Sequence, residues 1–209
     1  MKLVGMLDSP YVRRVAISLQ LLGLPFEHQP LSVFRTFEDF RRINPVVKAP
    51  TLVCDDGTVL MDSSLILEYA EALSRPRTLL PQARPALLRD LRLTGLALAA
   101  TEKSVQVVYE RQLRPADKQH EPWLQRVAGQ LRAAYAELES ELAVRSPAAK
   151  DQAPGRAAIT VAVGWHFTRQ LLPDLIRKDD FPHLAALSEA LEALPAFRAA
   201  PHGDGTCKA

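Results

Sequence analysis

The sequence predicts a small α/β domain over residues 1–80, followed by an all-helical domain over residues 85–209, with a linker at about residues 74–84. Two observations predict this division. Up to about Leu80, short β-rich runs alternate with short runs of helical periodicity, whereas after Pro81 the strand patterns stop. The length agrees, because at roughly 150 residues per domain a chain of 209 residues holds between one and two domains.

The first half has the element order β-α-β-α-β-β-α. The predicted strands cover residues 3–7, 26–31, 51–54 and 58–61. The predicted helices cover residues 11–22, 34–43 and 63–73. Gly23 follows the first helix at a C-cap position, and Asp55-Asp56-Gly57 predicts a hairpin between the last two strands. A strand-helix-strand opening implies a parallel pair with a right-handed crossover, and the hairpin adds an antiparallel edge.

The second half is punctuated by prolines that separate pieces of helical length, each rich in alanine and leucine. The predicted helices cover residues 87–109, 123–142, 157–172 and 183–194. This pattern predicts an all-helical bundle.

Composition and charge exclude several classes of protein. Lys and Arg number 26 against 24 Asp and Glu, a net charge of +2 without basic runs, which disfavours nucleic-acid binding. Cys54 and Cys207 cannot form a disulfide scaffold or a metal finger, so no metal site is expected and a reducing, cytoplasmic setting is the default. The apolar start is too short for a signal peptide, and no run approaches the roughly 18 apolar residues that span a bilayer.

Three short segments of the first half combine polar groups with helix starts. Ser9 precedes Pro10 at a strand-to-helix turn, Pro50 directly precedes a strand, and Asp62-Ser63 opens the third helix. Each has a structural interpretation, as an N-cap for Ser9 and for Asp62-Ser63, and as an edge start for Pro50. Each also has a functional one. A cis bond before Pro50 would turn the preceding backbone toward an extended ligand, and the amides at the third helix start would hold a carboxylate, with Asp62 placed for an ammonium.

In their order and spacing, these segments resemble the cytosolic glutathione transferase superfamily, and most of all its bacterial serine-type members. The resemblance rests on three motifs and extends from residue 1 to about residue 200. The motifs are Ser9-Pro10-Tyr11-Val12-Arg13-Arg14-Val15, Asn44-Pro45 with Lys48-Ala49-Pro50-Thr51-Leu52, and Leu60-Met61-Asp62-Ser63. It implies a thioredoxin-like N-terminal domain (βαβαββα) and an all-helical C-terminal domain that contributes an electrophile pocket.

The resemblance also implies roles for individual residues. The Ser9 hydroxyl would hydrogen-bond the glutathione sulfur, Ala49 before Pro50 would pair with the cysteinyl backbone, and Asp62 and Ser63 would hold the γ-glutamyl end. Lys48 would face the peptide. Arg35, in the loop after the second strand, is our own expectation for the glycyl carboxylate.

For the second substrate, the expected pocket residues are Tyr11, Tyr109 and His166, although a packed core position is the alternative for His166. Glutathione would be a co-substrate, no other cofactor is implied, and the partners would be a small hydrophobic electrophile and a second copy of the chain in a homodimer. Such activity is typical of detoxification. The alternative is a non-catalytic binding or interaction module of the same fold.

The sequence departs from the family pattern at two places. Val163 stands where the family carries the acidic residue of a Ser/Thr-x-x-Asp cap, which here begins at Thr160, and Val46-Val47 replaces a glycine-containing turn. Because Ser9 and Val12 occupy both cysteine places of a glutaredoxin-like motif, a protein-thiol redox cycle is disfavoured.

Of the adjacent arginines at 13 and 14, one is expected to form an ion pair and the other to face solvent. Cys54 is expected to be a buried apolar residue, and Cys207 to lie in a frayed tail.

Overall fold

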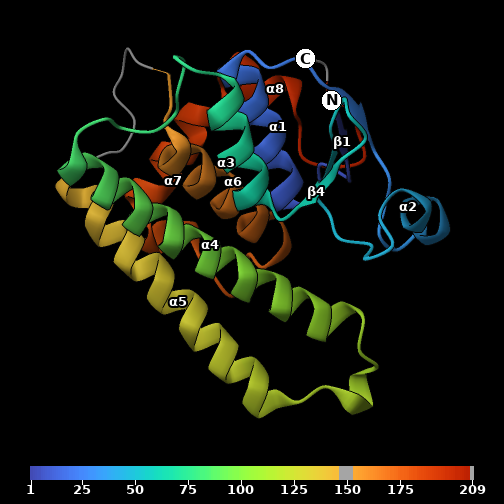
Figure 1. Ribbon diagram of the computed structural model, residues 1–209. Helices are drawn as coiled ribbons and strands as arrows, with labels where there is room; N and C mark the ends of the chain where they lie inside the picture. The colour runs from blue at the N-terminus through green and yellow to red at the C-terminus, as the bar shows by residue number, and fades with distance from the viewer. Residues whose placement is uncertain (146–152, 208–209) are drawn as a thin grey trace. The chain divides into compact units, whose positions relative to one another are not determined.

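The computed structural model (Figure 1) describes residues 1–145 and 153–207. These residues form two compact units. The first comprises Met1–Leu79 together with Glu192–Ala209, and the second comprises Leu80–Leu191. The sequence prediction placed all of residues 85–209 in the helical domain, whereas the contacts group the last segment with the first unit.

The first unit has the thioredoxin-like βαβαββα order that the sequence predicted. Its strands are β1 (Lys2–Val4), β2 (Glu27–Gln29), β3 (Thr51–Val53) and β4 (Val59–Met61). Its first three helices are α1 (Pro10–Leu22), α2 (Phe37–Ile43) and α3 (Ser63–Leu73). The sheet order is β2-β1-β3-β4, with β1 and β2 parallel and the β1–β3 and β3–β4 pairs antiparallel.

All four strands and helix α2 are shorter than predicted, and for β1 and α2 the structure shows a local cause. Strand β1 ends at Val4 rather than residue 7, because Gly5 has a φ of +140° and turns the chain out of the sheet. Helix α2 begins at Phe37 rather than residue 34, because the Ser32 hydroxyl accepts hydrogen bonds from the amides of Phe34 and Arg35 in a preceding turn.

The core of this unit lies between the sheet and the helices α1 and α3. The side chains of Leu3, Ile17, Leu52 and Ile66 are fully buried there. Burial of each stabilises the fold by about 1.5–3 kcal/mol relative to exposure. Cys54 is also buried, as predicted.

The C-terminal segment packs on α1 through Arg13, which is 2% exposed. Its guanidinium donates two hydrogen bonds of 2.6 Å to the Glu192 carboxylate and one of 2.8 Å to the Ala200 carbonyl. It also lies 5.8 Å from the ring centre of Phe197, on the short helix α8 (Pro195–Ala199). These contacts explain why residues 192–209 belong to the first unit. They also confirm the ion pair expected of one of the two adjacent arginines.

Beyond α8, the described part of the tail, which ends at Cys207, is held by hydrogen bonds rather than frayed. The Cys207 amide donates to His28 Nδ1 at 2.9 Å, and the Gln20 side chain donates to the Cys207 sulfur at 3.4 Å. The expectation of a frayed tail at Cys207 was therefore wrong. The reason is a set of partners on α1 and β2 that lie far away in the sequence.

The second unit is helical, as predicted. Its long helices are α4 (Arg84–Gln112), α5 (Glu121–Val144), α6 (Arg156–Leu171) and α7 (Pro182–Glu192), with 3₁₀ turns at Ala116–Lys118 and Lys178–Asp180. Helices α4 and α5 run side by side (Figure 1). Helix α7 ends before residue 194, because Leu194 becomes the cap of α8. None of the described helices combines the length and the apolar character that a membrane crossing requires.

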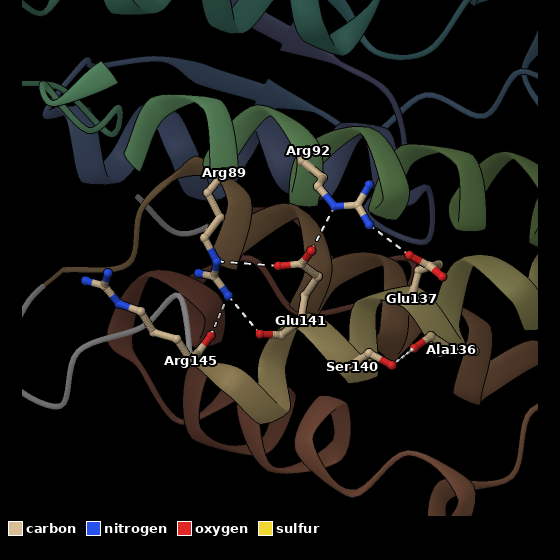
Figure 2. Close-up of polar contacts among 7 residues, drawn as sticks. All are labelled: Arg89, Arg92, Ala136, Glu137, Ser140, Glu141 and Arg145. Atoms are coloured by element: carbon tan, nitrogen blue, oxygen red, sulfur yellow. Dashed lines mark hydrogen bonds and ion pairs between the residues drawn. The ribbon is translucent and has the colours of Figure 1, made fainter. Parts of the chain in front are cut away.

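Charged side chains tie α4 to α5 along one side (Figure 2). Arg92 bonds Glu137 and Glu141, at 2.8 Å each, and these partners raise its pKa, Glu141 more than Glu137. Arg89 donates to the carbonyls of Glu141 and Arg145 at 2.8 and 2.7 Å. The Glu141 carbonyl also accepts a hydrogen bond of 3.2 Å from the Arg145 amide, so Arg89 adds a second donor to the last turn of α5.

The N-terminus of α6 is capped from another helix. Asp90 of α4 is buried, and its carboxylate accepts a hydrogen bond of 3.1 Å from the Ala157 amide. Thr160 lies inside the helix and donates to the Arg156 carbonyl. The segment from Thr160 to Val163 therefore lies inside α6, and the start of this helix receives a carboxylate from α4.

Candidate functional site

The strand register brings the three sequence segments to one end of the sheet. Val4 of β1 lies opposite Thr51 of β3, which lies opposite Met61 of β4. The β1–α1 turn, the residues before β3 and the start of α3 therefore leave the sheet at the same end. The first two are also close together, since a Cβ at Gly5 would lie 3.2 Å from that of Ala49.

Ser9 is the N-cap of α1 and is half-buried. Its hydroxyl oxygen accepts a long hydrogen bond of 3.4 Å from the Val12 amide. Among the described residues no acceptor receives the Ser9 hydroxyl proton. The structural interpretation as a cap therefore holds, and it leaves a hydroxyl donor at the positive end of α1.

The peptide bond between Ala49 and Pro50 is cis. Within the described part of the chain, neither the N–H nor the C=O of Ala49 has a hydrogen-bond partner. The loop around it is held by two buried polar residues. The Asn44 amide donates to the Thr51 hydroxyl at 2.8 Å, and that hydroxyl donates to the Lys48 carbonyl at 2.6 Å.

Two residues at this end of the sheet have positive φ although they carry side chains. Val47 has a φ of 52° and Asp62 a φ of 69°. Such angles are unfavourable for residues other than glycine, and most of all for β-branched ones. Val47 is one of the two valines that replace the glycine-containing turn, so the turn persists without glycine.

Asp62 and Ser63 open α3. The Asp62 carboxylate accepts a hydrogen bond of 2.8 Å from the Ser64 amide and so caps the helix. Ser63 supplies the first amide of the helix and is 2% exposed, and its hydroxyl accepts a 3.0 Å hydrogen bond from Arg14 of α1. Arg14 is also 2% exposed, so the expectation that one arginine of the pair faces solvent was wrong.

The two predicted basic residues of the site are both exposed. Lys48 lies beside Ala49, on the loop that Thr51 holds. Arg35 lies in the turn after β2 and forms a two-pronged ion pair with Asp204 of the tail, at 3.1 and 2.9 Å. Arg35 lowers the pKa of Asp204. Burial raises the pKa of nearby Asp8, the charge of Asp204 raises it further, and Arg35 opposes this.

The expected pocket residues for a second substrate fall in different units. Tyr11 is half-buried on α1 in the first unit, Tyr109 is exposed on α4, and His166 is half-buried on α6 in the second. Their shared pocket stays a prediction. In the described part of the chain, no group of His, Cys, Asp and Glu side chains is arranged to hold a metal ion.

The structure adds residues that the sequence analysis did not assign to the site. Arg14 holds the start of α3, Asn44 and Thr51 hold the loop before β3, and Asp204 forms an ion pair with the Arg35 guanidinium. The first three lie within the quoted motifs, so the motifs contained them without indicating their contacts. Asp204 carried no sequence signal.

Comparison with known proteins finds a matching family and similar proteins. The glutathione S-transferase N-terminal domain family matches residues 3–78. The uncharacterized GST-like protein YibF of Escherichia coli is 31% identical over 197 residues, which cover 94% of this chain and 96% of that protein.

Two solved structures are similar over nearly the full length. A glutathione S-transferase of Methylobacterium radiotolerans, in complex with glutathione sulfonate, has a TM-score of 0.86 and 29% identity, over 94% of this chain and 92% of that one. A glutathione transferase family member of Pseudomonas fluorescens Pf-5, with bound glutathione, has a TM-score of 0.79 and 32% identity, over 95% and 97%.

Proposed function

The chain belongs to the glutathione S-transferase family, and we propose that it is a glutathione transferase that activates the glutathione thiol for attack on a small hydrophobic electrophile. The observation that carries this proposal is the Ser9 hydroxyl. It caps α1, it is half-buried, and its proton has no acceptor in the described part of the chain. A sulfur at this helix start would receive that proton in a hydrogen bond.

Each part of glutathione has a group of matching chemistry at this end of the sheet. The sulfur would lie at Ser9, and the cysteinyl backbone would pair with the N–H and C=O of Ala49, which have no partner among the described residues. The γ-glutamyl carboxylate would bind Ser63 and the γ-glutamyl ammonium Asp62. The glycyl carboxylate would bind Arg35, with Lys48 facing the peptide. Bound glutathione and glutathione sulfonate in the two solved relatives support the choice of ligand.

The energies are sufficient for the proposed role of Ser9. A free thiol with a pKa of about 8.5 is mostly protonated at neutral pH, and the thiolate is the nucleophile. Lowering that pKa by about two units requires about 2.7 kcal/mol. A hydrogen bond from Ser9 to the anion supplies about 1.5–3 kcal/mol, and the start of α1 adds about 0.3–1 kcal/mol. Ser9 therefore acts as a donor and does not need to ionise.

The decisive experiment is the Ser9→Ala variant. We expect the pKa of bound glutathione to rise by about one to two units, followed by thiolate absorbance during a pH titration, and conjugation to a generic aromatic halide to fall. Ser9→Thr keeps a hydroxyl and should retain most of the shift. Ser18→Ala, a buried serine of the same helix, is the matched control. An unchanged thiolate titration in Ser9→Ala refutes the role of Ser9.

The same preparation separates the enzyme from a non-catalytic module of the family. Retention on glutathione resin together with conjugation supports the transferase. Retention without turnover of any electrophile class tried, whether halide, epoxide, enone or peroxide, supports the binding module.

A homodimer follows from the family resemblance and is part of the proposal. Apolar side chains at the surface of β4 and α3 support it, since Met61, Leu65 and Tyr69 are all exposed. Sedimentation equilibrium tests it, and a Leu65→Glu variant should shift the mass toward the monomer.

A further inference from the structure

The tail beyond α8 is attached to the sheet through one histidine. His28 on β2 is 7% exposed, and both nitrogens of its ring have a backbone partner. Nδ1 lies 2.9 Å from the Cys207 amide nitrogen, and Nε2 lies 2.8 Å from the carbonyl oxygen of Gly5, where the β1–α1 turn begins. One ring therefore joins the tail to the turn that leads to Ser9.

These two partners fix the position of the proton on the His28 ring. A backbone amide only donates and a carbonyl only accepts, so Nδ1 is unprotonated and Nε2 carries the hydrogen. A protonated ring would keep its bond to the Gly5 carbonyl, because both nitrogens of an imidazolium are donors. At Nδ1, however, it would place one N–H against the N–H of Cys207. Protonation of His28 therefore releases the tail and leaves the β1–α1 turn in place.

The tail held in this way carries the ion-pair partner of Arg35. Asp204 stands shortly before Cys207 and bonds the Arg35 guanidinium through both carboxylate oxygens, at 3.1 and 2.9 Å. Both side chains are more than half exposed, and an exposed ion pair is weak by itself. The attachment of Cys207 to His28 keeps the Asp204 carboxylate near Arg35 and so raises its effective concentration there.

The surroundings of His28 influence its protonation. Burial lowers the pKa of His28 from its ordinary 6.5, and the Gly5 carbonyl opposes this. Successive side chains of a strand point to opposite faces, so Glu27 lies on the other face of the sheet, where it pairs with Lys2 of β1 at 3.7 Å. On the turn, on α1 and in the tail, the groups that are charged or that titrate near neutral pH are Asp8, Arg13, Arg14, His202, Asp204 and Cys207.

We propose that tail residues 201–207 form a pH-operated latch, in which neutral His28 holds Asp204 on Arg35 and protonated His28 releases it. This inference rests on the proposed glutathione-binding function, in which Arg35 takes the glycyl carboxylate. Asp204 and the glycyl carboxylate of glutathione then compete for one guanidinium, and the competition ends when the tail is released. The affinity for glutathione therefore rises as His28 becomes protonated.

The first test varies the pH. Binding of S-methylglutathione, which has no thiol proton to lose, is measured by titration calorimetry at about pH 7.5 and about pH 5.0. The wild type should bind about two- to fivefold more tightly at the lower pH, the gain expected from freeing Arg35. His28→Asn keeps an acceptor oxygen near the place of Nδ1 and does not titrate, so its affinity should not rise. Asp204→Asn should bind with the higher affinity at both pH values.

The second test removes the amide donor at constant pH. Cys207→Pro has no backbone N–H, so at about pH 7.5 it should already bind about two- to fivefold more tightly than the wild type. Cys207→Ala, which also lacks the thiol but keeps the amide, is the matched control and should bind as the wild type does. Asp8→Asn and His202→Gln should keep the pH response, because that response belongs to His28.

A third measurement moves only if His28 and the ligand are coupled. Because the ligand displaces Asp204 and loosens the tail, saturation with S-methylglutathione should raise the pKa of His28 in an NMR titration of its ring protons. In Asp204→Asn the ligand has no carboxylate to displace, and this rise should be absent. A purely structural role for His28 predicts no such difference.

The outcomes are distinguishable. If the wild type binds neither glutathione nor S-methylglutathione, the proposed function fails, and this inference fails with it. If it binds them and Cys207→Pro matches Cys207→Ala, or the wild type and His28→Asn respond to pH alike, the latch alone is overturned. A His28 ring that stays neutral down to about pH 5.0 overturns it as well. Circular dichroism verifies the fold of each variant, and if His28→Asn does not fold, Cys207→Pro decides the question.

Discussion

Replacement of Arg13 by methionine tests how the C-terminal segment is held on the first unit. The substitution keeps an unbranched side chain in a site that is only 2% exposed. It removes the two 2.6 Å bonds to Glu192, the bond to the Ala200 carbonyl and the contact with the Phe197 ring.

The magnitude follows from these losses. Removing one partner of a buried ion pair costs about 3–5 kcal/mol, because the other charge stays behind without it. The Glu192 side chain is 23% exposed, so water reaches the remaining carboxylate and the lower end, about 3 kcal/mol, applies. In a chain of this size such a loss lowers the melting temperature by about 6–12 °C.

Urea denaturation followed by circular dichroism measures the free energy of unfolding. In the double variant Arg13→Met/Glu192→Met, neither charge of the pair remains. We therefore expect its free energy of unfolding to exceed that of Arg13→Met by at least about 1–2 kcal/mol. Arg42→Met, which breaks the exposed pair with Asp39, is the control and should cost under about 1 kcal/mol. If Arg13→Met costs no more than this control, the C-terminal segment is not held by Arg13.

Three further predictions concern the site and the tail. Asp204→Asn frees Arg35 and should tighten glutathione binding by about two- to fivefold in calorimetry, a gain that vanishes in an Arg35→Gln background. Val47→Gly removes the backbone strain of a β-branched residue at a φ of 52°. Because this strain costs more than the conformational entropy that glycine adds to the unfolded chain, urea denaturation should show a free energy of unfolding higher by about 0.5–1 kcal/mol. Burial lowers the pKa of His28 from its ordinary 6.5, so the unfolded chain binds the proton more tightly than the folded chain does. The free energy of unfolding therefore decreases as the pH falls below 6.5, the pKa of His28 in the unfolded chain. Thermal unfolding at about pH 7.5 and about pH 5.5 should show this loss, and His28→Asn should show less of it, whereas equal losses would exclude His28 as the cause.

The order of elements in both units could be predicted from the sequence, because it depends on local patterns. Periods of 2 and 3.6 residues mark strands and helices, and Asp55-Asp56-Gly57 marks the hairpin. The hairpin in turn sets the register that aligns Thr51 with Met61, so the approach of the residues before β3 to the start of α3 follows from a local signal. The β1–α1 turn joins them through the long-range pairing of β1 with β3.

The supporting contacts could not be predicted in this way. Arg13 and Arg14 are adjacent on one helix, about 100° apart, and the sequence does not indicate that both are buried against different partners. Glu192 is 179 residues from Arg13, and Asp204 is 169 residues from Arg35. Such pairs depend on packing between distant segments, as does the assignment of residues 192–209 to the first unit.

Helix α1 connects these observations, because its side chains serve both the site and the scaffold. Ser9 caps its start, Arg14 reaches Ser63 on α3, and Arg13 reaches Glu192 at the C-terminal segment. Since Arg13 and Arg14 are neighbours on one rigid helix, a shift of α1 toward the tail would also move the donor behind Ser63. Loosening the tail at Arg13 should therefore weaken glutathione binding in titration calorimetry, although Arg13 lies outside the site, whereas Arg42→Met should leave that affinity intact.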